Sequence, residues 1–237
     1  MKVLQKKTDI ATSRRELDAL GASALDSHFR RLQRRLGMVT GMPIGDFVKS
    51  WDVLQTIRFL QGHVAKEQPV LDIGAFASEI VVALHKLGYS DLTGVDLDPN
   101  LKEMPYSEMI RYEVCDFKKT PFPDGSFNAI TSISVIEHGY DGSALFQEVT
   151  RLLKPGGYFI ASFDYWQSKI DTNGIDFFGM SWNIFSEVDV IQLMQIAHTC
   201  GLHPIEPCEF TGLESPIRCG GKNYTFAWVV LKKDLVG

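Results

Sequence analysis

The amino-acid sequence predicts an α/β fold in which a parallel sheet is connected by crossover helices. Two observations carry this prediction. Between residues 69 and 163, short apolar runs of strand length alternate with helical patterns of about 10–15 residues, the pattern typical of parallel strands joined by helices. The chain has 237 residues, of which 45% are hydrophobic. That is enough for one large domain with a substantial core.

The segment before the sheet is predicted to be helical. Leucine and phenylalanine recur near helical spacing over residues 9–36, so a first helix is expected there. A second helix is expected from Asp46, which suits an N-cap, to Gly62, which suits a helix stop. We therefore divide one globular unit into an N-terminal helical cap, residues 1–62, and a main domain, residues 63–237.

Five apolar patterns make up the predicted sheet region. They cover residues 69–74, 91–99, 110–117, 127–138 and 158–163. Helical patterns over residues 78–88 and 143–157, each ending in glycine, provide two of the crossovers.

The rest of the chain begins with an aromatic-rich stretch, residues 164–185, that has no regular pattern. Ser186 and Asp189 then form a plausible capping box that opens a helix ending at Gly201. Two further strands are expected around residues 203–210 and 224–232.

Two residues at predicted strand ends point to a nucleoside-binding site. Gly74 ends the first strand, where a glycine lets the backbone approach a ligand closely. Asp96 ends the second strand, 22 residues later. An acid at about this spacing can accept hydrogen bonds from both ribose hydroxyls of an adenosyl group. Ligands of open α/β sheets bind at this edge.

Composition and charge exclude several classes of protein. The net charge is −5, although residues 1–35 contain nine Lys and Arg against four Asp and Glu. The acidic main body argues against a nucleic-acid partner. No apolar run approaches the ~20 residues of a membrane span, and the N-terminus lacks the apolar run of a secretory signal. We expect a cytoplasmic protein with reduced cysteines.

Four residues near the C-terminus invite comparison with a zinc site. Cys200, His203, Cys208 and Cys219 are separated by spacings that match no common structural zinc pattern. We therefore expect no metal and interpret the cysteines as unpaired thiols.

The motifs between residues 68 and 163 resemble those of class I S-adenosylmethionine (SAM)-dependent methyltransferases, in order and spacing. In sequence order they are LDIG, GVDLDP, CDF, PFPDGSFNAI, VIEHG and RLLKPGGYF. Dinucleotide-dependent dehydrogenases share the first two but not the last. The resemblance implies a Rossmann-like, doubly wound sheet of seven strands, mostly parallel with an antiparallel last strand, preceded here by the N-terminal helices.

The resemblance also implies the cofactor, SAM, and the residues around it. Asp96 would bind the ribose and Leu97 the adenine face, while Asp116 and the Phe117 backbone would lie at the adenine edge. The Gly74 turn and Ser134 would face the methionine end. The residues expected to bind SAM are Asp72, Gly74, Ala75, Phe76, Asp96, Leu97, Asp116, Phe117 and Ser134.

One departure from the family pattern affects the turn after the first strand. The family often has glycine at alternate positions there, and this chain has Gly74, Phe76 and Ser78. Phe76 and Ser78 are compatible with the turn if their φ angles are negative. A SAM-binding regulatory or scaffold protein without catalysis is therefore the alternative to an enzyme. An NAD-dependent oxidoreductase is disfavoured because the second and third glycines that a pyrophosphate needs are absent.

The methyl acceptor is expected to lie near His138, which ends the fourth strand beside Glu137. His138 is the candidate base for a hydroxyl acceptor, and capping of the following helix is an equally open role for it. The residues expected to line the acceptor site are Asp164, Tyr165, Trp166 and Trp182. The alternative for these aromatic residues is a hydrophobic core beneath a long loop.

The sequence therefore predicts an enzyme, a methyltransferase that acts on an O or N atom of a small molecule. A sugar or a natural-product intermediate is one possibility for the acceptor. No nucleic-acid or membrane partner is expected. The basic pairs Arg30/Arg34 and Arg31/Arg35 could bind a phosphate-bearing substrate or the acidic patch of a second subunit, giving a homodimer through the N-terminal helices, or they could face solvent.

Overall fold

The computed structural model describes residues 1–25, 36, 38 and 43–235. The N-terminal elements are β1 (Lys2–Val3), α1 (Lys7–Ala19), the short 3-10 helix η1 (Phe47–Lys49) and α3 (Ser50–His63). The middle of the chain forms β2 (Val70–Ile73), α4 (Ile80–Lys86), β3 (Leu92–Asp96), η2 (Pro99–Glu103), β4 (Arg111–Val114), β5 (Phe127–Ile133), α5 (Gly142–Leu152) and β6 (Leu153–Tyr165). The last elements are β7 (Asp176–Phe177), β8 (Met180–Ser181), α6 (Glu187–Thr199), β9 (Leu202–Pro204), β10 (Ile217–Cys219) and β11 (Lys222–Lys233).

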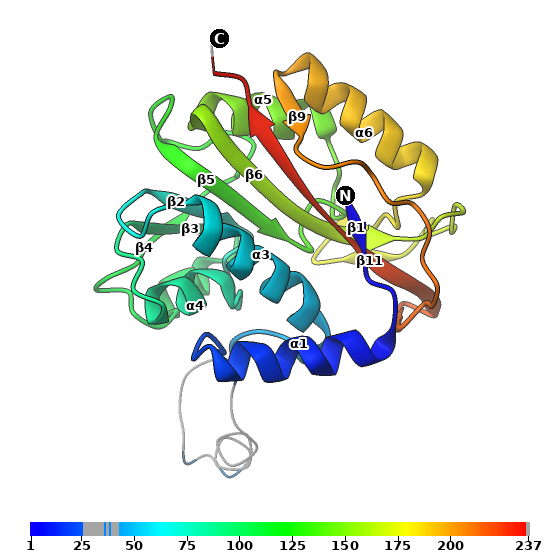
Figure 1. Ribbon diagram of the computed structural model, residues 1–237, viewed down its shortest axis with the longest axis horizontal. Helices are drawn as coiled ribbons and strands as arrows, with labels where there is room; N and C mark the ends of the chain where they lie inside the picture. Colours follow the sequence, from blue (N-terminus) through cyan, green and yellow to red (C-terminus); the bar gives the residue numbers. More distant parts are fainter. Residues whose placement is uncertain (26–35, 37, 39–42, 236–237) are drawn as a thin grey trace.

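The expected α/β fold is confirmed by the order of the strands. The main path of the sheet is β1-β11-β6-β5-β2-β3-β4 (Figure 1). Strands β6, β5, β2, β3 and β4 are parallel to one another, and β11 is antiparallel to β6. The antiparallel last strand follows the expectation. The described sheet has nine strands because β9 and β10 also pair with β11, so it is wider than expected.

Strand β6 carries the two faces of the sheet on alternate residues. Side chains of a strand point alternately to opposite faces, so Ser162 and Asp164 share the face toward α3, where the Ser162 hydroxyl donates to Asp52. Phe163 and Tyr165 share the opposite face and join the second core cluster. The strand extends to Tyr165, beyond the expected end at residue 163, because Thr225 of β11 pairs with Tyr165.

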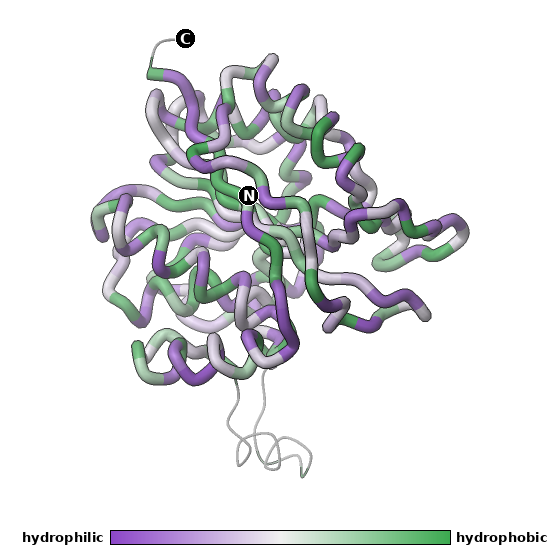
Figure 2. Tube along the Cα trace, turned by 45° about the vertical axis from the view of Figure 1, so that its right-hand side comes forward, coloured by the Kyte–Doolittle hydropathy of each residue, from purple (hydrophilic) through white to green (hydrophobic). Residues whose placement is uncertain are grey.

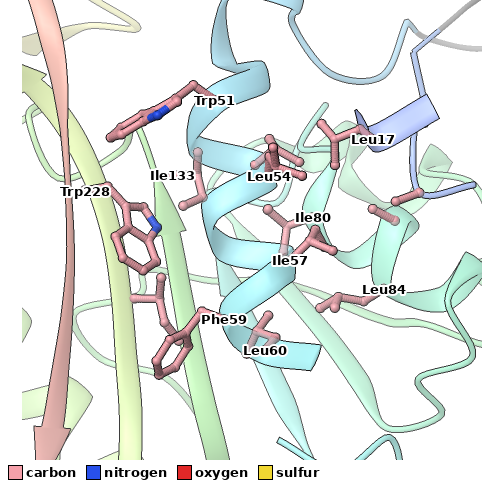
Figure 3. Close-up of a cluster of buried hydrophobic side chains, with 14 of the residues drawn as sticks. Leu17, Trp51, Leu54, Ile57, Phe59, Leu60, Ile80, Leu84, Ile133 and Trp228 are labelled. Atoms are coloured by element: carbon pink, nitrogen blue, oxygen red, sulfur yellow. The ribbon is translucent and has the colours of Figure 1, made fainter. Parts of the chain in front are cut away.

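Two helical layers cover these faces. Apolar residues of α1, α3 and α4 build the first core with the sheet, and Figure 3 shows Leu54, Ile57 and Leu60 of α3 within it. Residues of α5 and α6 build the second core. Figure 2 shows hydrophobic residues concentrated in the strands that cross the centre of the molecule. Both cores depend on burial of apolar surface, which is the main stabilising effect in a fold of this kind.

The first helix is shorter than expected, since α1 ends at Ala19 and not at residue 36. Gly21 adopts a left-handed φ of +70°, and the N–H groups of Ala22 and Ser23 both turn back to the carbonyl of Leu17. This is a helix C-terminus closed by a glycine. The remaining part of the expected helix, including its four arginines, lies largely outside the described residues.

The other N-terminal predictions can be compared directly. Asp46 caps η1, as expected, by accepting from the N–H of Val48, and the helical segment continues to His63, one residue beyond the expected stop at Gly62. Residues 1–62 also contribute a strand, because β1 pairs with Trp228 and Ala227 of β11. Among the described helices, none has the length and apolar character needed to cross a membrane.

Candidate cofactor and acceptor site

The turn after β2 is shaped by Gly74. Its φ is +74°, and an added Cβ would lie 2.3 Å from a methyl carbon of Val135. The N–H groups of Gly74 and Ala75 both donate to the carbonyl of Val95, at 2.9 and 3.0 Å. Only glycine combines this backbone conformation with this close approach. The turn is thereby packed directly against the segment that follows β5.

The absence of glycine at positions 76 and 78 is explained by the backbone. Neither Phe76 nor Ser78 is among the non-glycine residues with positive φ; that conformation falls on Ala77, with φ of +58°. The Ala77 N–H points to the sulfur of Met104 at 3.3 Å. The turn therefore keeps its course without the two glycines.

Asp72 anchors the turn after β2 through hydrogen bonds to two hydroxyl groups. One carboxylate oxygen accepts from the hydroxyl of Ser78 at 2.7 Å, and the other accepts from Thr131 at 2.6 Å. Burial raises the pKa of Asp72 to about 7. Because both oxygens already have partners within the protein, Asp72 is placed to orient the turn and not to reach outward.

Asp96 lies at the exposed end of β3 and is fixed by two backbone groups. Its Oδ2 accepts from the N–H of Phe76 at 3.0 Å, and its Oδ1 accepts from the N–H of Asp98 at 3.0 Å. The first bond connects the acid directly to the glycine turn. Each carboxylate oxygen has a further lone pair, so the group can still accept hydrogen bonds from a ligand. Leu97, the next residue, is 54% exposed.

Asp116 and Phe117 follow β4 at the same edge. The N–H of Cys115 donates to the carbonyl of Asp96 at 3.0 Å, which places the two strand ends side by side. Asp116 is exposed and accepts from the N–H of Lys118, whereas Phe117 packs against the second core. The structure therefore brings the expected ribose and adenine residues to one end of the sheet.

The segment after β5 supplies the expected methionine-side and acceptor residues. Ser134 has a positive φ of +53°, and its hydroxyl is buried with no partner in the described part of the chain. His138 is half-buried, with the rings of Phe177 and Phe178 at 6.1 and 5.4 Å from its own. Burial, and secondarily Lys49, lower the pKa of His138 to about 4. Its imidazole is therefore neutral at physiological pH.

The aromatic-rich stretch is fastened to this segment. The N–H of Asn183 donates to the carbonyl of Glu137, and that of Gly139 donates to Ser181, both at 2.9 Å. The indole N–H of Trp182 donates to Asp164 at 2.7 Å. Trp182 is itself buried in the first core, so part of the stretch is core, as the alternative interpretation held. The structure nevertheless brings Asp164 and Trp182 to the segment that carries Glu137 and His138.

The two other residues expected to line the acceptor site, Tyr165 and Trp166, lie in different surroundings. Tyr165 faces the opposite side of the sheet, fully buried, and its hydroxyl donates to the carbonyl of Phe210 at 2.6 Å. The strand alternation that directs Asp164 toward α3 directs Tyr165 away from it, and so the expected contact of Tyr165 with an acceptor is not supported. Trp166 is half-buried against the first core.

Sequence reasoning missed Asp52, in the first turn of α3. Its side chain is fully buried. One oxygen accepts from Ser162 at 2.8 Å, while Oδ1 has no partner among the described residues. Burial raises the pKa of Asp52 to about 7. A signal was present in the sequence, because this acid stands between Trp51 and Val53 in a helix whose apolar residues are buried.

Comparisons with known proteins point to one kind of domain. Residues 71–161 match a family model described as a methyltransferase domain. Over 93 residues the chain is 33% identical to the ubiquinone/menaquinone biosynthesis C-methyltransferase UbiE of Desulfotalea psychrophila, which is 37% of this chain and 38% of that protein. Over 100 residues it is 31% identical to a ubiquinone biosynthesis O-methyltransferase of Xanthomonas oryzae, covering 39% of this chain and 41% of the relative. The matched region spans less than half of either relative.

The fold extends further than the sequence match. A crystal structure titled as a putative sarcosine dimethylglycine methyltransferase from Galdieria sulphuraria superposes with a TM-score of 0.56. The superposition covers 89% of this chain and 99% of that one, at 17% identity. At that identity the similarity concerns the fold alone.

Proposed function

We propose that the protein transfers a methyl group from SAM to an oxygen or nitrogen atom of a small-molecule acceptor. The match of residues 71–161 to a methyltransferase domain model, and the fold shared with a methyltransferase of known structure, support this proposal. The observation that carries the proposal is the hydrogen bond between the Phe76 N–H and Asp96 Oδ2, at 3.0 Å. It joins the glycine turn to the acid at the end of the neighbouring strand, the two features that an adenosyl ligand requires.

The residues at this edge fit SAM. Asp96 keeps free lone pairs for the two ribose hydroxyls, and the exposed Leu97 is available to the adenine face. Asp116 and the backbone of Phe117 would hold the adenine edge. The buried hydroxyl of Ser134, which has no partner among the described residues, would serve the methionine end.

The chain's own residues would contribute mainly placement. SAM supplies a methyl group on a sulfonium, which is already an activated leaving group. Alignment of the acceptor can then provide much of the rate. For a hydroxyl acceptor, the neutral imidazole of His138 is free to take the proton, since its pKa of about 4 keeps it unprotonated at neutral pH.

A non-catalytic SAM-binding protein is the weaker interpretation. It depended on the two missing glycines, and neither Phe76 nor Ser78 has a positive φ. The backbone of the turn after β2 therefore does not require glycine at positions 76 and 78.

The test is a screen of methyl acceptors with SAM and the purified protein, read by mass spectrometry as a gain of one methyl group together with formation of S-adenosylhomocysteine. Asp96→Asn serves as the matched variant. We expect at least one acceptor class to give product with the wild type and much less with the variant. Tight SAM binding with no product from any class would favour the non-catalytic alternative.

A further inference from the structure

Three carboxyl groups are buried together on the acceptor side of the candidate site. Asp52 comes from α3, Glu137 from the segment after β5, and Asp164 from β6. They are 0%, 1% and 5% exposed, respectively. We call these three residues the acidic cluster.

Hydrogen bonds hold the acidic cluster in one place. Ser162 donates to Asp52, and its neighbour on the same face of β6 is Asp164. Trp182 donates to Asp164, and the next residue in the chain, Asn183, donates through its N–H to the Glu137 carbonyl. Burial is the main cause of the raised pKa values of Asp52 and Glu137, and repulsion by the Asp164 carboxylate adds to it.

The other buried carboxylates of the described chain have hydrogen-bond partners on both oxygens. Arg14 binds Glu79 with two hydrogen bonds of 2.7 and 2.8 Å, and Arg151 binds Glu148 at 2.7 and 2.8 Å. Asp72 has hydroxyl donors on both oxygens. A buried carboxylate is normally paired or fully hydrogen-bonded in this way.

The acidic cluster lacks such neutralisation. Asp52 Oδ1 and Glu137 Oε2 are buried with no hydrogen-bond partner anywhere in the described chain. No ion pair of the described residues involves any of the three carboxyls; Lys49, half-buried in η1, only lowers their pKa values from a distance. Three acids in one buried place, two of them with an unused acceptor atom, are costly in their ionised form unless a positive charge completes them.

The positive charge that the acidic cluster requires is better supplied by an organic cation than by a metal ion. Across the described residues, no group of three His, Cys, Asp or Glu side chains is arranged to hold a metal. Aromatic rings surround Trp182, whose indole N–H donates to Asp164: its ring centroid lies 5.1 Å from that of Phe177 and 5.7 Å from that of Tyr224. Carboxylates combined with aromatic rings are the usual surroundings of a bound ammonium group.

The acidic cluster also lies where an acceptor should be. Glu137 stands directly before His138 and two residues after Val135, the residue packed against the Gly74 turn. We propose that the methyl acceptor carries a positively charged amine, and that Asp52, Glu137 and Asp164 bind this group beside the cofactor. The inference rests on the proposed function, because it assigns the substrate class of the same site.

The pH dependence of binding follows from the groups that surround the amine. Besides the three acids these are Lys49 of η1, His138 and Tyr224 of β11. Burial raises the pKa of Asp164 to about 6 and that of Asp52 to about 7. Asp164 and Asp52 therefore lose protons as the pH rises through this range, while a simple amine with a pKa near ~10 stays charged. Affinity for the cation should increase with pH.

The experiment measures binding of methylammonium, and of methanol as its uncharged counterpart, to the protein saturated with S-adenosylhomocysteine, by ligand-observed NMR. We expect methylammonium to bind and methanol not to, with a methylammonium affinity that rises roughly tenfold between about pH 5.5 and 7.5 as the acids ionise. Asp52→Asn and Glu137→Gln should each weaken methylammonium binding roughly tenfold or more. Asp176→Asn, which removes the same charge from the exposed β7, should leave it unchanged.

The outcomes separate the two proposals. If S-adenosylhomocysteine binds but methylammonium binds no better than methanol, or binds independently of pH, the amine assignment is overturned and the methyltransferase proposal stands. Failure of S-adenosylhomocysteine to bind overturns the proposed function itself. Retained cofactor binding in the Asp52 and Glu137 variants shows that they are folded, so a methylammonium affinity equal to that of the wild type would also overturn the assignment.

Discussion

At the scale of single residues, the end of the sheet that is expected to bind SAM is shaped by a few specific contacts. Gly74 is fixed by Val135, Asp96 by the N–H of Phe76, and Asp72 by two hydroxyls. The sequence predicted the positions of Gly74 and Asp96, because strand ends and spacing are visible in it. It could not predict that Ala77 would take the left-handed conformation, since that depends on how the turn packs.

Gly74→Ala should destabilise the protein by more than strain alone. A left-handed alanine costs about 1–2 kcal/mol, and here the new methyl group would also meet Val135 at 2.3 Å. Gly125→Ala is the matched control, because Gly125 has a φ of +62° but no atom within 4 Å of an added Cβ. Urea unfolding should show a larger loss for Gly74→Ala, together with weaker SAM binding. Equal losses in the two variants would contradict the close contact.

His138→Ala should lower turnover of a hydroxyl acceptor by ~10²–10⁴-fold, the usual contribution of a general base, and leave SAM affinity unchanged. The lowered pKa of about 4 determines the pH profile. The imidazole is neutral above that value and becomes protonated as the pH falls through it. Wild-type turnover should therefore be level with respect to this group from about pH 6 to 8 and fall toward pH 4. An inflection near 6.5, or an unchanged rate in the variant, would contradict this role.

Asp52→Asn should make the protein more stable at high pH. Asp52 has a pKa raised to about 7 in the folded protein, against about 3.9 in an unfolded chain. The folded state therefore holds this proton more tightly, and the associated stability is present below about pH 4 and is lost as the pH rises through 7. The variant lacks that loss, so its advantage in unfolding free energy should grow to roughly 2–4 kcal/mol by pH 8. If urea titrations gave a difference in unfolding free energy between the variant and the wild type that did not change with pH, this prediction would be wrong.

At the scale of elements, capping signals predicted where helices begin, whereas the end of α1 and the long-range contacts were not predicted. The capping box of Ser186 and Asp189 opens α6 as expected, and Asp46 caps η1. The alternation of β6 decided which aromatic residues face the site. Tyr165 was wrongly expected to line the acceptor site. The sequence shows that side chains alternate along a strand but not which of the two faces each one takes. Asp52 and Ser162, 110 residues apart, meet only through packing of α3 on the sheet.

Helix α1 is joined to the cofactor turn through one buried ion pair. Arg14 donates to both carboxylate oxygens of Glu79, just before α4, and Glu79 also accepts from the N–H of Ala24. Arg14→Ala should cost about 3–5 kcal/mol of stability, since it leaves a buried carboxylate without its partner. Arg15→Ala, in the same helix but exposed, should cost far less. Thermal or urea unfolding measures both, and similar losses would mean that the pair does not hold α1 in place.

At the scale of the whole molecule, the expected chain order of strands and crossovers was sufficient to predict the layered α/β architecture. The antiparallel β11 between β6 and the outer strands follows the family resemblance. The additional strands were not predictable. β1 has two residues and β10 has three, too few for a periodic pattern, and both exist because the long β11 offers them a free edge.

We infer that one end of this sheet binds the adenosyl group of SAM through Asp96. Calorimetric titration of SAM and of NAD into the wild type, Asp96→Asn and Asp91→Asn tests it most directly; Asp91 is an exposed acid just before the other end of β3. We predict that the wild type and Asp91→Asn bind SAM equally and do not bind NAD. Asp96→Asn should lose about 1–3 kcal/mol of SAM binding free energy, the value of hydrogen bonds to a charged group. SAM affinity unchanged by Asp96→Asn would show that Asp96 does not bind the ribose, and NAD bound as tightly as SAM would show that this end of the sheet is not a SAM site.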